Sequence, residues 1–202
     1  RRHLPLLAPP ERFRSGLRRS CQTLLSGGVT TIQDASVAND LAAYEAFRTW
    51  IADGDIQLRV MLLIGASALP EVIDAGLTPG RGSPFLRVQG VKIRLDEASG
   101  ALHPLPEVVN AQIWSAHDQG FPVAIHAVEV PALVSALHAI RQAQARLPGT
   151  KLRHRIEHAA LCPEVCIDEL ADLHVAVVTQ PAFLWYHGRR YLAEVDPEQQ
   201  PW

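Results

Sequence analysis

Three strand-like stretches decide the fold of this chain: Val91-Lys92-Ile93, Ala124-Ile125-His126-Ala127 and Arg155-Ile156-Glu157-His158-Ala159. Each carries one residue able to bind a metal ion, and the spacing between those residues is nearly constant. From Lys92 to His126 is 126 − 92 = 34 positions, and from His126 to His158 is 158 − 126 = 32. A repeating strand–helix unit needs about 30 residues. The spacing therefore predicts three side chains next to one another at one rim of a parallel sheet.

Strand-like and helix-like segments alternate along the whole chain. Apolar and β-branched runs predict strands at residues 29–32, 58–64, 91–95, 123–126, 155–158 and 175–179. Apolar periodicity and end signals predict helices at residues 11–25, 40–51, 70–75, 106–119, 131–146 and 163–173, with Asn39 as a capping residue. Residues 183–202 match neither pattern. There, Trp185, Tyr186 and Trp202 either form a lid or, as we expect, pack in the ordinary way.

Strict alternation implies a parallel sheet with helices outside it, as in a doubly wound sheet or a barrel. A doubly wound nucleotide binder usually has a glycine-rich turn directly after its first strand. Here Gly27-Gly28 precedes its strand, and Gly80-Arg81-Gly82 follows no strand directly. A complete barrel needs about 250 residues. We therefore predict an α/β fold of the incomplete (β/α)₈ TIM-barrel type, with about six strand–helix units in one partial domain over residues 1–202.

The composition is that of an ordinary enzyme domain. Of the 202 residues, 48% are hydrophobic and 20% charged, and the net charge of −2 favours neither nucleic acid nor an anionic membrane as partner. No apolar run approaches the roughly 18 residues of a spanning helix.

Three cysteines form no disulfide framework, which favours a reducing, cytoplasmic location. Because the chain does not begin with Met and stops abruptly, we expect an internal piece of a longer protein.

The three spaced residues are candidate metal ligands. His126 and His158 each end a predicted strand, where barrel enzymes place their chemistry. Lys92 lies two residues deeper, which is about 6.6 Å of rise and roughly the reach of a lysine side chain. A lysine ligates a metal only when it is neutral or converted by CO₂ to a carbamate. Imidazole nitrogens with a carboxylate-like oxygen suit a divalent ion, with Zn²⁺ the expected one.

Each candidate also has a plainer interpretation. A strand-end histidine is often a rim or core residue, and Lys92 alone could be a buried ion-pair partner. A second zinc hypothesis uses the i, i+4 spacing of His158, Cys162 and Cys166. Three further residues are candidate substrate contacts: Asp96, His103 and Gln180. Arg94, on the same side of its strand as Lys92, is expected to pair with Asp96 or with substrate.

Four strings together resemble the amidohydrolase superfamily, and within it the amidohydrolase-3, YtcJ-like group. They are Gly28-Val29-Thr30-Thr31-Ile32-Gln33-Asp34, Val91-Lys92-Ile93, Val123-Ala124-Ile125-His126-Ala127 and His154-Arg155-Ile156-Glu157-His158-Ala159. The resemblance implies a distorted barrel with one or two divalent ions at its mouth. It places Lys92, as a carbamylated bridging ligand, on the fourth strand, and His126 and His158 at the ends of the fifth and sixth.

The resemblance is incomplete. The family has a His-x-His pair on its first strand and a catalytic aspartate on its eighth, and neither string occurs here. We therefore expect the chain to cover strands 2–7 of the barrel and the catalytic aspartate to lie outside it. We predict a metal-dependent hydrolase of amide or cyclic amide C–N bonds, acting on a small molecule. The alternatives are an inactive barrel-derived binding or structural fragment, and a lyase with Lys92 as Schiff-base amine. Open sheet edges further predict self-association as a homo-oligomer.

Overall fold

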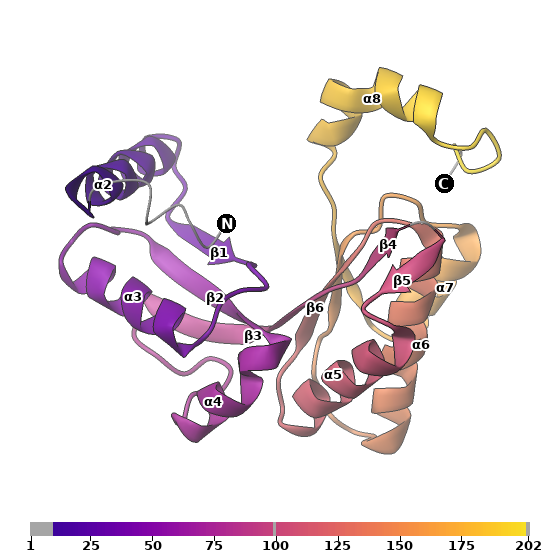
Figure 1. The fold of residues 1–202 in the computed structure, drawn as a ribbon, viewed down its shortest axis with the longest axis horizontal. Coiled ribbons are helices and arrows are strands. Elements are labelled where there is room, and N and C mark those ends of the chain that lie inside the picture. Colours follow the sequence, from indigo (N-terminus) through magenta and orange to yellow (C-terminus); the bar gives the residue numbers. More distant parts are fainter. Residues whose placement is uncertain (1–9, 99, 201–202) are drawn as a thin grey trace. The chain divides into compact units, whose positions relative to one another are not determined.

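The computed structural model describes residues 10–98 and 100–200. Its contacts divide the chain into two compact units, residues 1–89 and 90–202, and each is described by itself. The sequence had predicted a single partial domain. In each unit strands and helices alternate along the chain (Figure 1).

Hydrogen bonding joins six strands in the order β1-β2-β3-β6-β7-β8. Their bounds are β1 Thr31–Asp34, β2 Arg59–Gly65, β3 Leu86–Arg94, β6 Val123–Ala127, β7 Arg155–His158 and β8 Ala176–Val178. Pairing is parallel between β1 and β2, between β3 and β6, and onward through β7 to β8. Six strands in chain order, alternating with helices, are the arrangement of an incomplete (β/α)₈ barrel, which confirms the predicted fold.

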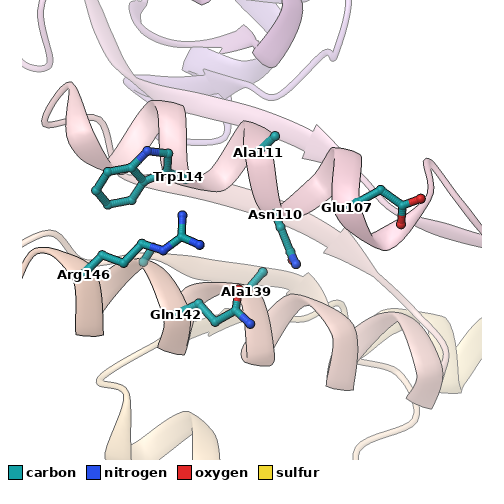
Figure 2. Close-up of a pocket in the computed structure, with 8 residues that line it drawn as sticks. Glu107, Asn110, Ala111, Trp114, Ala139, Gln142 and Arg146 are labelled. Atoms are coloured by element: carbon teal, nitrogen blue, oxygen red, sulfur yellow. The ribbon is translucent and has the colours of Figure 1, made fainter.

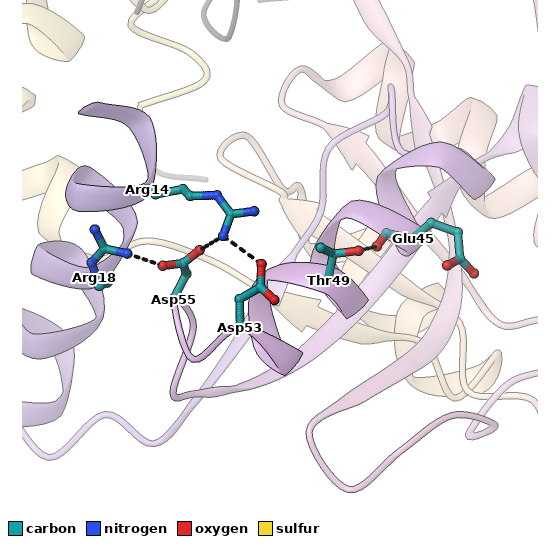
Figure 3. A network of polar contacts seen from close by, with 6 residues as sticks. All are labelled: Arg14, Arg18, Glu45, Thr49, Asp53 and Asp55. Atoms are coloured by element: carbon teal, nitrogen blue, oxygen red, sulfur yellow. Dashed lines mark hydrogen bonds and ion pairs between the residues drawn. The ribbon is translucent and has the colours of Figure 1, made fainter. Parts of the chain in front are cut away.

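The first unit contains helices α2 Pro10–Ser26, α3 Leu41–Ala52 and α4 Leu69–Asp74, with a 3₁₀ turn at Ala66–Ala68. An ion-pair network holds α2 to the end of α3 (Figure 3). Arg14 Nη1 lies 2.7 Å from the carboxylate of Asp55 and 2.6 Å from that of Asp53, and Arg18 contacts Asp55 as well. The Asp55 side chain is 1% exposed. Its buried charge therefore depends on these two arginines.

The cap of α3 is one residue later than predicted. Asp40 is the N-cap, and its Oδ1 accepts a 2.8 Å hydrogen bond from the Ala43 amide. Asn39 is buried instead, and its Nδ2 donates to Asp34 Oδ1 and to the Leu63 carbonyl at 3.0 and 2.9 Å. Asn39 thus ties the end of β1 to β2. Both residue types can cap a helix, so the sequence did not distinguish them.

The second unit contains α5 Pro106–Asp118, α6 Val130–Arg146, α7 Glu164–Asp172 and α8 Ala182–Glu194. Helices α5 and α6 pack against each other and against β6. Ile93 and Ile156 each lie between two charged residues of β3 and β7, Ile125 lies between Ala124 and His126 of β6, and all three isoleucines are buried. One face of the sheet is therefore apolar, and the opposite face is free to carry polar side chains. None of the described helices combines the length and the hydropathy needed to cross a membrane.

Two segments differ from the sequence prediction. Between the predicted strand at 91–95 and the predicted helix at 106–119, where no element was predicted, two short antiparallel strands form a hairpin, β4 Asp96–Ala98 and β5 Ala101–His103. Residues 183–202 were left unassigned, and most of them form α8, which buries none of its side chains. Trp185 is 87% and Tyr186 75% exposed, so the expected ordinary packing is wrong for both. Trp202 lies outside the described residues.

A chain of hydrogen bonds runs through two buried histidines at the end of the second unit's sheet opposite to His126. The Val123 amide donates to His154 Nδ1 at 3.1 Å, so the hydrogen of neutral His154 is on Nε2. That atom lies 2.8 Å from His117 Nδ1, and His117 Nε2 lies 3.0 Å from Thr150 Oγ1. In this chain each ring N–H group faces a hydrogen-bond acceptor only while His117 and His154 are both neutral. Burial, and then His117, lower the pKa of His154 to about 4.

This histidine pair predicts acid lability. The unfolded chain takes up a proton on His154 near pH 6.5, whereas the folded chain resists protonation until about pH 4. The stabilisation is therefore complete above pH 6.5 and lost as the pH falls towards 4, by about 3 kcal/mol at most. In urea titrations between pH 7 and 4.5, we expect His154→Gln to lose less unfolding free energy than the wild type. His138→Gln, on the exposed face of α6, is the control. Equal pH slopes for wild type and His154→Gln would contradict the assignment.

Candidate metal centre

The register of β3, β6 and β7 brings the predicted ligands to one end of the second unit's sheet. Lys92 is opposite Ala124, and Arg94 is opposite His126. Lys92 therefore lies two positions deeper than His126, as predicted. His126 in turn is opposite Glu157, and His158 lies one position further.

This register alone would turn His158 away from His126. Side chains alternate along a strand, so Glu157 shares the face of His126 and His158 would point to the other face. The backbone at His158 is left-handed, with φ of 79°, and that of Ala159 follows with φ of 46°. Such values are uncommon for residues other than glycine. They end β7 and turn the His158 ring back, so that its centroid lies 4.4 Å from that of His126.

Lys92 is buried, and its pKa is lowered. Its side chain is on the polar face of the sheet and the residue is 6% exposed. Burial lowers the Lys92 pKa to about 8, against a raising effect of Glu157 and a further lowering effect of Arg155. Arg155 Nε is 2.6 Å from Glu157 Oε1. Because Arg155 neutralises the nearest carboxylate, the lysine gains little support for its positive charge.

His126 has a charged neighbour in the hairpin. Its Nε2 lies 3.2 Å from Asp96 Oδ1, and the other oxygen of Asp96 lies 2.6 Å from Arg94 Nε, which confirms the predicted Arg94–Asp96 pair. The His126 pKa is lowered, first by burial and next by the neighbouring His158, although Asp96 acts in the opposite sense. His126 is therefore held neutral, which is the form that binds metals.

The remaining predicted residues are close to these. Gln180 follows β8, and its Oε1 is 2.5 Å from His158 Nδ1. His103 is the cross-strand partner of Asp96 in the hairpin, and its side chain is exposed. The structure thus brings Asp96 to His126 and Gln180 to His158, whereas His103 borders the site on an exposed strand. Contact of any of the three with substrate stays a prediction.

Sequence reasoning missed two polar residues of this site. Arg155 and Glu157 were read only as parts of a family string. Both lie on the polar face, and Glu157 is 7% exposed. The signal was available in the sequence, because charged residues at alternate positions of a central strand, on either side of the apolar Ile156, need a polar environment on one face.

The donor set fits a divalent ion if Lys92 takes part. Within residues 10–98 and 100–200, no group of three or more His, Cys, Asp or Glu side chains is placed to hold a metal. This contradicts the alternative site of His158, Cys162 and Cys166. The helix α7 begins only at Glu164, so Cys162 does not share its face. Two adjacent imidazoles and a lysine whose burial favours the neutral amine are instead ligands of the kind that suits zinc-like ions.

Two surface hollows of the second unit are separate from these residues. One, of about 310 Å³, lies between α5 and α6 and is lined by residues including Glu107, Trp114 and Arg146 (Figure 2). The Arg146 guanidinium lies over the Trp114 ring at 5.4 Å. The other, of about 630 Å³, borders Thr150 and His174. Neither is lined by Lys92, His126 or His158.

Comparison with known proteins identifies the family of this chain. The sequence model of the amidohydrolase family (Amidohydro_3) matches residues 2–201, and the chain belongs to this family. No curated protein sequence matches it.

Solved structures share the fold. An uncharacterized metal-dependent hydrolase from Pyrococcus furiosus is 22% identical with a TM-score of 0.80, and the match covers 99% of this chain and 44% of that one. One from Pyrococcus horikoshii OT3 is 23% identical, also at 0.80, over 99% and 43%. Aspergillus niger ochratoxinase is similar at 15% identity and a TM-score of 0.55, over 96% and 50%. The chain thus spans less than half the length of the two Pyrococcus hydrolases.

The environment of Lys92 predicts an unusual reactivity. The chain has two lysines, Lys92 and Lys151, so the exposed Lys151 serves as internal reference in competitive labelling with an amine-specific reagent. We expect the pH midpoint of Lys92 labelling near 8. Glu157→Gln removes the supporting carboxylate and should move the midpoint lower, whereas Arg155→Gln removes a repelling charge and should move it higher. A midpoint near 10.5, or one that neither variant moves, would contradict the assignment.

Proposed function

We propose that this chain supplies the central strands of a metal-dependent hydrolase that cleaves C–N bonds of amides or cyclic amides. The proposal is carried by one observation. His126 and His158 lie at the carboxyl ends of two adjacent parallel strands and Lys92 lies two positions deeper on a third, in a chain that belongs to the amidohydrolase family. In barrels of this type the chemistry is found at those strand ends.

In this proposal His126, His158 and Lys92 hold the ion, with zinc the expected one. When bound, such an ion polarises a carbonyl and lowers the pKa of a water molecule towards 7. The protein provides a neutral imidazole at His126, because burial lowers the pKa of that ring and keeps it available as a ligand. The general base of the reaction, an aspartate in this family, is expected outside the chain.

Lys92 is proposed to act as a carbamate. The neutral amine adds to CO₂, forms an N–C bond and releases one proton to solvent, which leaves a carboxylate-like anion at the end of the side chain. Burial favours this reaction because it lowers the Lys92 pKa to about 8 and so raises the share of neutral amine at neutral pH. Arg155, 2.6 Å from Glu157, prevents that carboxylate from fully supporting an ammonium.

The substrate is proposed to be a small molecule that enters beside the β4–β5 hairpin. His103 is exposed on β5, opposite Asp96, and the Asp96 carboxylate contacts both Arg94 and His126. A polar group of a substrate at this edge would meet an imidazole and a guanidinium. We retain Asp96, His103 and Gln180 as the substrate-side residues of the proposal.

Metal content tests the proposed ligands. We expect the protein to bind one or two zinc-like ions through these residues and to lose most of this metal in the double variant His126→Ala/His158→Ala. His138→Ala, an exposed histidine on α6, is the matched control and should keep its metal. Elemental analysis after dialysis measures both. Unchanged metal content in the double variant would exclude the proposed centre.

One observation favours a second candidate, an inactive barrel-derived binding or structural fragment. The chain spans only 44% and 43% of the two Pyrococcus hydrolases. Only the second candidate predicts that no protein containing this chain hydrolyses amides with the help of zinc. Zinc-dependent amide hydrolysis by this chain, abolished in the double histidine variant, would exclude the second candidate.

We further propose that the chain self-associates in a reducing, cytoplasmic setting. Support for the setting comes from Cys21, Cys162 and Cys166, which are all free thiols. Support for association comes from β8, the last strand in the hydrogen-bonding order, whose Val177 and Val178 are more than 40% exposed. Such an apolar strand edge pairs readily with another chain.

Light scattering tests this association. We expect a mass at least twice the 22.2 kDa of one chain, reduced by Val178→Lys, which puts a charge at the edge. Val134→Lys, at an exposed valine of α6, should leave the mass unchanged. A uniform 22.2 kDa species for the wild type would contradict the proposal.

A further inference from the structure

The side-chain amide of Gln180 determines which nitrogen of His158 carries hydrogen. Gln180 Oε1 lies 2.5 Å from His158 Nδ1. An amide oxygen only accepts, so the hydrogen of neutral His158 is on Nδ1. A neutral imidazole has one N–H group, and the lone pair of His158 is therefore on Nε2.

Neutral His126 carries its hydrogen on the other ring nitrogen, Nε2. Its Nε2 faces Asp96 Oδ1 at 3.2 Å, and the Asp96 carboxylate is itself held by Arg94. An ionised carboxylate only accepts, so the His126 hydrogen is on Nε2 and the lone pair on Nδ1. The two adjacent rings thus offer different nitrogens, each selected by one neighbouring oxygen.

Gln180 is well placed to orient the His158 ring. It comes from the segment after β8, 22 residues from His158, and its backbone carbonyl accepts from the Phe183 amide at the start of α8. The backbone of His158 is left-handed, a conformation that persists only where the surrounding structure holds it. The hydrogen bond from Gln180, in a separate segment, supplies one such restraint on the ring.

We propose that Gln180 is a positioning residue of the metal centre: it fixes His158 as the Nδ1–H tautomer and leaves Nε2 directed to an ion. This inference rests on the proposed function and assigns Gln180 a role towards a ligand rather than towards substrate alone. Hydrogen bonds of this kind to ligating histidines typically change metal affinity 10–100-fold.

Two-dimensional ¹⁵N NMR of the metal-free chain at pH 8 tests the tautomer without any metal. We expect His158 to be protonated on Nδ1 in the wild type and in Gln180→Glu, which keeps an accepting oxygen. In Gln180→Leu we expect a mixture of tautomers. Gln142→Leu removes the similar Gln142–His138 contact on α6 and is the matched control, which should leave His158 unchanged. Agreement of the amide fingerprints shows that each variant is folded.

Zinc titration of the same four proteins completes the test. We expect a dissociation constant 10–100-fold weaker for Gln180→Leu and near the wild-type value for Gln180→Glu and Gln142→Leu. A wild-type His158 protonated on Nε2, or a Gln180→Leu variant with unchanged tautomer or unchanged zinc affinity, would overturn the inference. Failure of the proposed function is distinct, because it would show as zinc binding that survives replacement of both His126 and His158.

Discussion

The parallel register of β3, β6 and β7 is the constraint on which the rest of the second unit depends. It places Arg94, His126 and Glu157 on one level and Lys92 two residues deeper. A slip of one residue would send each polar side chain to the apolar face of the sheet, where Ile93, Ile125 and Ile156 are now buried. The same register therefore maintains both the core and the candidate site.

Charge balance in the site follows from that register. Arg155 and Glu157 occupy alternate positions of β7 and pair with each other at 2.6 Å, beside the buried Lys92. A buried lysine with an unshared carboxylate would stay an ammonium, which repels a metal. Because the carboxylate is shared with Arg155, burial dominates and the Lys92 pKa is lowered to about 8. Arg155 and Glu157 are not proposed ligands, but their pairing favours the neutral form of Lys92, which is one.

The strand order, and the placement of Lys92, His126 and His158 towards one end of the sheet, were predictable because both depend on periodic patterns. Strand–helix alternation and spacings of 34 and 32 residues are visible without coordinates. The left-handed turn at His158 was not predictable, since neither histidine nor the following alanine signals it. The hairpin at residues 96–103 and helix α8 were missed for a related reason. The hairpin strands have only three residues each, and four of the apolar residues of α8 are consecutive, at 183–186, instead of recurring at helical spacing.

We propose centrally that Lys92, His126 and His158 converge on a single ion. Anomalous diffraction at the zinc edge, from crystals of this protein grown with zinc, tests this directly. We expect a peak within bonding distance of His158 Nε2, of a ring nitrogen of His126 and of an oxygen on a carbamylated Lys92. A zinc peak bound by other residues, with these three side chains uncoordinated, would contradict it.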